Sequence, residues 1–191
     1  MSTATHSILV ACEQAVAIAG LDEALAECGL CVRSADYAQA AAALDADGGG
    51  PLVVAPALAP ERAGDDWRDV ATELTRNFEL IQRFVRSAIA QKRGGHLVAL
   101  LPAAAAMGDP LDGGTSALTG GMLSLVRTLA LEFRKLGMTA NAVLYDRAGS
   151  GIEHAAAVAS LVQTLVAQPG NAISGQTIFA CSAGDTGRLH P

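Results

Sequence analysis

Short apolar runs alternate along the chain with longer stretches in which apolar residues recur every three or four positions. The periodic stretches 67–92 and 115–135 predict long amphipathic helices. Shorter helices are expected before residue 28, at 38–44 and at 154–167. The uninterrupted apolar runs predict buried parallel strands at 7–11, 30–34, 52–55, 97–101, 139–144 and 176–181. Because strand and helix alternate throughout, we expect a doubly wound parallel α/β sheet covered on both faces.

The helix predicted at 67–92 carries more apolar side chains than a single buried face needs. One stripe contains Leu74, Phe78 and Ile81, while Leu80 and Phe84 are offset from it around the helix. A helix exposed to water on one side does not need both sets, so the second set favours contact with another subunit. The alternative is that these stripes serve only the core of the chain itself.

Composition limits the possible partners and compartments. Thirteen Lys and Arg stand against nineteen Asp and Glu, the net charge is −6, and no basic stripe is formed, which argues against a nucleic-acid partner. No apolar run approaches the roughly 20 residues of a membrane span. The first residues lack the basic segment of a secretory signal. We therefore expect a cytoplasmic protein without a membrane partner.

The cysteines and histidines do not predict a redox or metal site. Cys28 and Cys31 have the spacing of a redox pair, but they fall where a helix ends and a buried strand begins. A redox motif places its first thiol at a helix N-terminus, which lowers the thiol pKa. The four histidines lie apart from carboxylates and cysteines at ligand spacing. We interpret the cysteines as packing residues and expect no metal.

Five segments carry a resemblance to a known family. They are 25–32 (LAECGLCV), 94–101 (GGHLVALL), 125–133 (LVRTLALEF), 137–143 (GMTANAV) and 173–178 (ISGQTI). In this order and spacing they resemble the short-chain dehydrogenase/reductase family over about residues 7 to 184. The resemblance implies a single Rossmann-like domain, residues 1–191.

The family's phosphate-binding turn carries three glycines, and the resemblance places Cys12, Val16 and Ile18 at those positions. Glycine is needed there because the backbone must approach the cofactor pyrophosphate at a helix N-terminus. The branched side chains of Val16 and Ile18 are expected to occupy the space of the phosphates. We therefore expect this chain to bind no NAD. Asp36 stands where the family has its cofactor-selecting acid and is interpreted as a loop or cap residue.

The family's catalytic residues are also replaced. By the same resemblance the tyrosine falls on Thr115, the lysine on Thr119 and the serine on Pro102. The asparagine falls on Glu73, or on Leu74 if the register slips by one. A tyrosine acting as general acid and base contributes roughly 10²–10⁴ in rate, and threonine has no comparable acidity. These positions are therefore expected to be catalytically silent.

Two segments are shorter than the family pattern. Fifteen residues, 37–51, separate Asp36 from Leu52, whereas a strand with its crossover needs about 30. The third strand and its helix are therefore expected to be missing. The substrate lid, residues 146–152, is short as well.

These features favour a non-catalytic subunit that assembles with an active, NAD-binding paralogue of the same family. The chain resembles the degenerate subunit type of the heterotetrameric dehydrogenases of anaerobic toluene degradation, which implies a β-hydroxyacyl-CoA substrate such as 2-[hydroxy(phenyl)methyl]succinyl-CoA. Two alternatives stay open: a homomeric ligand-binding or regulatory module, and an enzyme of altered mechanism that uses Glu73, Asp112 or Tyr145. The predicted interface residues are Leu74, Phe78, Ile81, Phe84, Val85, Met122, Leu125, Leu129, Phe133, Ile178 and Phe179.

Overall fold

Six parallel strands form the centre of the computed structural model, which describes residues 6–12, 18–47, 50–56, 67–109, 111–147, 152–167 and 172–180. The strands are β1 His6–Ala11, β2 Leu30–Ala35, β3 Leu52–Val54, β4 Gly95–Pro102, β5 Met138–Tyr145 and β6 Thr177–Ala180. Their order is β2-β1-β3-β4-β5-β6, and every neighbouring pair is parallel. The predicted α/β class with a doubly wound parallel sheet is confirmed.

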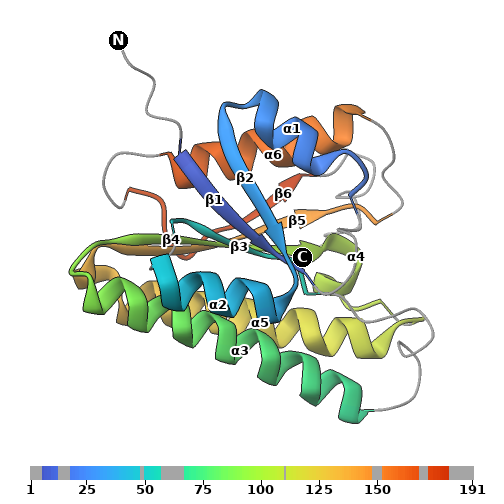
Figure 1. Ribbon diagram of the computed structural model, residues 1–191. Coiled ribbons are helices and arrows are strands. Elements are labelled where there is room, and N and C mark those ends of the chain that lie inside the picture. The colour runs from blue at the N-terminus through green and yellow to red at the C-terminus, as the bar shows by residue number, and fades with distance from the viewer. Residues whose placement is uncertain are drawn as a thin grey trace.

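Helices cover both faces of this sheet (Figure 1). Helices α1 Leu21–Glu27 and α6 Ile152–Val166 lie on one face. Helices α2 Tyr37–Asp47, α3 Trp67–Ala90 and α5 Gly113–Glu132 lie on the other. The single turn α4 Ala103–Ala106 follows β4, and a 3₁₀ turn Arg134–Leu136 follows α5. Of the helices in the described ranges, none combines the length and the apolar character needed to cross a membrane.

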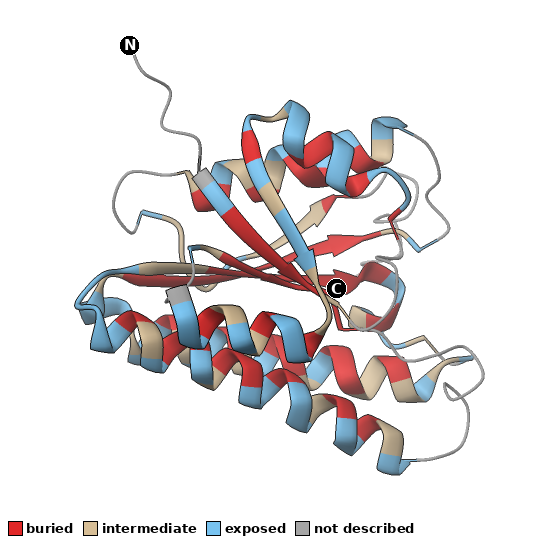
Figure 2. Ribbon diagram, viewed as in Figure 1, coloured by how far each residue is buried: buried red, intermediate tan, exposed pale blue. Residues whose placement is uncertain are grey.

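The core has one apolar cluster on each face of the sheet, as alternation along the strands requires. Leu9, Leu97 and Leu144 face the layer of α2, α3 and α5, while Val10 and Val98 face α1 and α6. All eight residues of β5 are buried. Figure 2 shows the same burial along the central strands. A parallel sheet covered on both sides explains why its strands are nearly continuous apolar runs.

The chain reverses its direction across the sheet after β2. It passes from β1 outward to β2 over the face of α1, and then returns past β1 to β3 over the opposite face, through α2. Strand β2 is the edge of the sheet within the described residues, in agreement with the expected loss of a third strand. In open α/β sheets the crevice at such a reversal point, beyond the carboxyl ends of the strands, is where ligands bind. Here that point lies between β1 and β3.

Helix α2 is longer than the sequence predicted, and Asp36 begins it. The Asp36 carboxylate accepts a hydrogen bond from the Gln39 backbone N–H at 2.7 Å, and the Asp36 carbonyl accepts one from Ala40 N–H at 2.8 Å. Asp36 is thus an N-cap residue. The prediction that this acid serves as a cap is confirmed.

The buried side of α3 differs from the stripe that the sequence predicted. Phe78 is half exposed, while Leu80 and Phe84 are buried in the core. Glu73 and Asn77 are buried with them, although glutamate and asparagine are usually exposed. The contact with α2 accounts for the change, because it covers a side of α3 that polarity alone assigns to solvent.

A buried hydrogen-bond network joins α2 to α3. The Tyr37 hydroxyl lies 2.9 Å from Oε1 of Glu73 and 2.9 Å from Oδ1 of Asn77. The Asn77 side-chain amide donates to the Glu73 carbonyl at 2.8 Å and reaches Glu73 Oε1 at 3.2 Å. Buried polar groups are tolerated when they are hydrogen-bonded in this way. The network therefore fixes α2 on α3 in one register.

Replacement of Tyr37 by phenylalanine should reveal the strength of this connection. Tyr37→Phe removes the shared donor and leaves two buried acceptors without it, so we expect a loss of about 1–3 kcal/mol in the free energy of unfolding. Urea denaturation followed by circular dichroism measures the change. Ser34→Ala, which removes an exposed hydrogen bond to Asp22, is the matched control and should change stability by less than about 0.5 kcal/mol. Equal effects of the two substitutions would contradict the assignment.

Candidate functional site

The candidate site lies at the carboxyl ends of β1, β2 and β3. Cys12 N–H donates to the Ala35 carbonyl at 3.1 Å, and Ala55 N–H donates to the Ala11 carbonyl at 3.0 Å. Both bonds continue the ladders past the last residues assigned to the strands. Cys12, which stands at the first glycine position of the resemblance, is half buried and packs against the core on the α1 side. The three strand ends are therefore held together at the point where a dinucleotide would approach.

Helix α1 begins late and with an acidic first turn. Its first residue is Leu21, and Gly20 before it has a left-handed φ of 78° and gives no side-chain cap. Asp22 and Glu23 follow at once, both exposed, and the Ser34 hydroxyl donates to Asp22 at 2.7 Å. Carboxylates in a first turn stabilise the helix but occupy the positive end of its dipole. A pyrophosphate needs that end free of negative charge.

Ile18 has a different role from the one that the sequence suggested. Its side chain is 3% exposed and belongs to the core cluster that also contains Leu21 and Leu25. The Ile18 carbonyl accepts from Leu21 N–H at 3.3 Å, where the chain turns into α1. The expected steric obstruction at this position is therefore corrected to a packing role, because its methyl groups lie in the interior. Val16, the other branched residue of that prediction, lies outside the described residues.

The residues at the catalytic positions fall into separate surroundings. Thr115 and Thr119 lie one turn apart on the buried side of α5, and the Thr115 hydroxyl has no hydrogen-bond partner among the described residues. Pro102 ends β4, in register with Tyr145 of β5. Glu73 is in α3, in the network with Tyr37. Of the four predicted positions, only the two threonines are neighbours on one helix.

Asp112 and Tyr145 are the other two residues considered for an altered mechanism. Asp112 caps α5, where its carboxylate accepts from Thr115 N–H at 2.9 Å and pairs with Arg147 at 3.2 Å. Burial raises the pKa of Tyr145, and the nearby Arg147 cation opposes that rise only in part. A tyrosine that acts as a base near neutral pH needs its pKa lowered. Of the three residues named for an altered mechanism, Glu73 and Asp112 have hydrogen-bonded structural roles, and Tyr145 is buried in the core.

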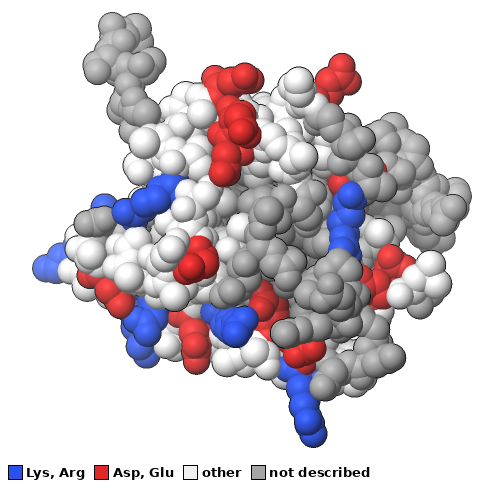
Figure 3. Space-filling model, turned by 45° about the vertical axis from the view of Figure 1, so that its right-hand side comes forward, with Lys and Arg blue, Asp and Glu red and all other residues white. Residues whose placement is uncertain are grey.

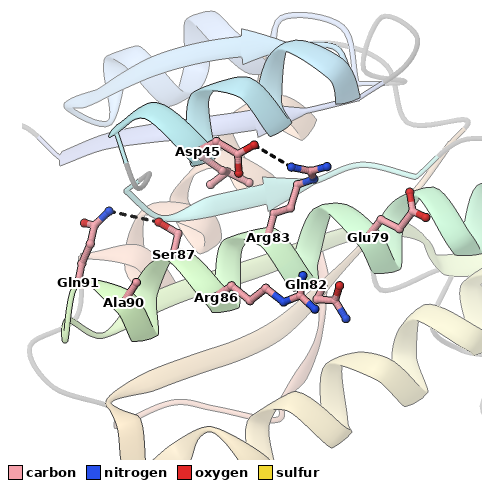
Figure 4. Close-up of a pocket in the computed structure, with 9 residues that line it drawn as sticks. Asp45, Glu79, Gln82, Arg83, Arg86, Ser87, Ala90 and Gln91 are labelled. Atoms are coloured by element: carbon pink, nitrogen blue, oxygen red, sulfur yellow. Dashed lines mark hydrogen bonds and ion pairs between the residues drawn. The ribbon is translucent and has the colours of Figure 1, made fainter.

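A hollow of about 590 Å³ between α2 and α3 lies away from these positions (Figure 4). Arg83 pairs with Asp45 across it at 2.7 Å, and the Gln91 amide donates to the Ser87 hydroxyl at 3.2 Å. Both signs of charge line the hollow, and Figure 3 likewise shows acidic and basic side chains interspersed over the face that it draws. Among the described residues, His, Cys, Asp and Glu nowhere gather in the groups of three that could hold a metal ion.

Solved structures share this arrangement of strands and helices. Acetoin dehydrogenase from Enterobacter cloacae superimposes with a TM-score of 0.76 at 17% identity, covering 98% of this chain and 100% of that one. Acetoin dehydrogenase YohF from Salmonella typhimurium has a TM-score of 0.72 at 16% identity, with 92% and 95% covered. A short chain dehydrogenase/reductase family oxidoreductase from Burkholderia thailandensis has a TM-score of 0.70 at 16% identity, with 93% and 92% covered. The chain has the short-chain dehydrogenase fold. No family model matches the sequence, and neither does any curated protein.

Sequence reasoning missed the partners that hold these residues in place. Tyr37 was not singled out, yet it binds Glu73 and Asn77 from 36 and 40 positions away. The pairing of Arg147 with Asp112 likewise joins residues 35 positions apart. The available signal was the occurrence of two polar residues, Glu73 and Asn77, four positions apart beside the apolar stripe of an amphipathic helix, which is compatible with a buried partner on another element.

The raised pKa of Tyr145 has a measurable consequence at alkaline pH. Because the folded-state pKa lies above the unfolded value of about 10, the folded chain holds the phenol proton more tightly, so stability is present below pH 10 and is lost as pH rises further. Denaturation curves should therefore fall more steeply above pH 10 for the natural chain than for Tyr145→Phe. The difference in ultraviolet tyrosinate absorbance between the two proteins reports the same ionisation. Ionisation of Tyr145 at or below pH 10 would show that burial does not raise the pKa of this phenol.

Proposed function

We propose that this chain is a non-catalytic subunit that assembles with an active, NAD-dependent paralogue of the same fold into an α2β2 alcohol dehydrogenase. The observation that carries the proposal is the start of α1, where Asp22 and Glu23 occupy the first turn and no basic residue accompanies them. In the dinucleotide-binding arrangement a helix N-terminus receives the pyrophosphate. Two carboxylates there repel that group, so we assign NAD to the partner subunit.

The arrangement at the catalytic positions supports the same assignment. Thr115, Thr119 and Pro102 supply no group that could exchange a proton with an alcohol near neutral pH. Glu73 and Asp112 are each held by hydrogen bonds with a structural role. An enzyme of altered mechanism would need one of these groups to be released.

An exposed apolar stripe on α3 supports a subunit partner. Trp67, Phe78 and Ile89 are 67%, 50% and 47% exposed and follow one another at intervals of eleven residues. Eleven residues make just over three helical turns, so the three side chains lie along one side of α3. Aromatic residues are enriched at the cores of protein interfaces. A partner lying along α3 would remove all three from water.

The predicted interface set becomes smaller in the structure. Ile81, Phe84, Val85 and Met122 are buried in the core of the chain itself, which accounts for their apolar character without a partner. Phe78 is the exposed member, and the others are partly buried against the two cores: Leu74, Leu125, Leu129, Phe133, Ile178 and Phe179. Trp67 and Ile89 join the proposed surface.

The substrate proposal rests on the sequence resemblance alone. A β-hydroxyacyl-CoA such as 2-[hydroxy(phenyl)methyl]succinyl-CoA is the substrate that it implies for the whole complex. One structural neighbour, a 4-hydroxyisoleucine dehydrogenase complexed with NADH and succinate, shares the fold at a TM-score of 0.70 and 14% identity. A shared fold does not identify the substrate, so the substrate must be tested by experiment.

Co-expression with a full-length paralogue tests the assembly and the location of the cofactor. We expect a stable hetero-oligomer on sizing, and one NADH bound per paralogue chain by fluorescence titration. When the glycine turn of the paralogue is disrupted, the complex should bind no NADH, because the first turn of α1 repels the pyrophosphate. NADH binding to the complex with the disrupted paralogue would place a cofactor site in this chain. Recovery of a homo-oligomer with no affinity for the paralogue would favour the homomeric ligand-binding or regulatory alternative.

A charge placed on the α3 stripe should separate the subunits. Phe78→Glu puts a carboxylate at the middle of the proposed surface, and we expect the affinity for the paralogue to fall about tenfold or more, since buried aromatic anchors dominate interface energy. Ile152→Glu on α6, at the opposite face of the sheet, is the control because Ile152 is 83% exposed. Equal co-purification of the two variants would remove α3 from the interface.

A further inference from the structure

A second hollow, of about 470 Å³, lies between α5 and the segment that precedes β6. One wall consists of Arg127, Ala130, Leu131 and Arg134. These positions are spaced i, i+3, i+4 and i+7, so they share one side of the helix and its 3₁₀ extension. The opposite wall includes Ser174 and Gly175. The hollow is therefore formed by segments that are separated in sequence by about forty residues.

The wall opposite α5 is held firmly to strand β5. Gly175 N–H donates to the Ala140 carbonyl at 2.7 Å, and the Ser174 hydroxyl accepts from Ala140 N–H at 3.2 Å. Gln176 N–H donates to the Asn141 side chain at 3.0 Å. Gly175 has a φ of +77°, and a Cβ at this residue would lie 3.4 Å from the Ala130 Cβ. A ligand entering the hollow thus meets a preformed wall and pays little to order it.

The charged residues among the described lining of the hollow are both arginines, Arg127 and Arg134. No ion pair or hydrogen bond joins either guanidinium group to another described residue, and no aspartate or glutamate is among the described residues that line the hollow. The hollow between α2 and α3 differs, because Asp45 and Glu79 line it beside Arg83 and Arg86 (Figure 4). Two cations without a counter-ion among the described residues, at one hollow of a chain with net charge −6, favour an anion between them.

The Ser174 hydroxyl adds a third donor. Since its oxygen already accepts from the Ala140 backbone, its hydrogen is available to a ligand. Two guanidinium groups and one hydroxyl match the charge of about −2 and the three terminal oxygens of a phosphate monoester. A carboxylate has one negative charge and two oxygens, so it would leave some of the donors of Arg127, Arg134 and Ser174 without an acceptor.

We propose that this hollow binds a small phosphate monoester, with its phosphoryl group between Arg127 and Arg134 and its organic part over Leu131. Leu131 is 82% exposed, and Ala130 beside it is apolar, so an aryl or alkyl body would cover surface that is now in water. The volume is within the range of small-molecule sites, roughly 300–1,000 Å³. The site is distinct from the cofactor and catalytic positions and does not depend on a partner subunit.

Calorimetric titration of the full chain with phenyl phosphate, inorganic phosphate and benzoate tests the proposal. Phenyl phosphate should bind saturably, more tightly than the other two, and more weakly as ionic strength rises. Arg127→Gln and Arg134→Gln should each lower its affinity about tenfold, which is the lower range for a charge-assisted hydrogen bond. Leu131→Ala should reduce the advantage of phenyl phosphate over inorganic phosphate. Arg86→Gln, an exposed arginine at the other hollow, is the matched control and should leave the affinity unchanged.

Three results would overturn the proposal. One is the absence of saturable phenyl phosphate binding at millimolar concentrations. Another is an equal loss from Arg86→Gln, which would show only non-specific attraction to surface cations. The third is tighter binding of benzoate, which would identify a carboxylate site instead. Thermal unfolding of each variant, expected to be unchanged because both arginines are exposed, verifies that lost binding does not come from lost folding.

Discussion

A parallel sheet requires helices on both of its faces, and in this chain the eleven residues of α2 provide that cover beside β1. Between β2 and β3 the chain has only α2 to cross the sheet. The helix itself is mostly alanine, with little side-chain area to bury. Its position therefore depends on Tyr37, which reaches Glu73 and Asn77 inside the contact with α3. The shortened fold is held at this edge by a polar connection.

The hydrogen bonds between Tyr37 and α3 also limit which side chains at the carboxyl edge of the sheet are free to act in chemistry. Glu73 occupies the position to which the resemblance assigns the family's asparagine, and here its carboxylate is engaged by Tyr37. The Asp112 carboxylate caps the N-terminus of α5 and forms an ion pair with Arg147. Groups with hydrogen-bonded structural roles are costly to release, because each leaves a partner unsatisfied. At this edge of the sheet, the hydrogen bonds of Glu73 and Asp112 hold helices in place.

The order of strands and helices was predictable from sequence, whereas the orientation of individual side chains was not. Continuous apolar runs such as Leu97–Leu101 identify strands buried on both faces, whatever their neighbours are. The exposed side of α3 was misjudged because Glu73 and Asn77 look like solvent-facing residues until Tyr37 is placed beside them. The orientation of the Ile18 side chain was misjudged for a similar reason. A branched residue in a turn can face either the core or the cleft. The start of α1 at Leu21 turns Ile18 toward the core. A local pattern can indicate that a buried polar residue has a partner, but it does not identify that partner when it lies far away in the sequence.

Three exposed apolar side chains on α3 bear on the proposal that this chain is a subunit of a larger assembly. Trp67, Phe78 and Ile89 are largely exposed, so burial within the monomer contributes little to stability at these positions. They lie along one line of the helix, while the residues of α3 that face the sheet form part of the core. An exposed line of this kind carries a risk of non-specific association. A specific partner that covers the surface would remove that risk, which is why the proposed assembly and the exposed line on α3 support each other.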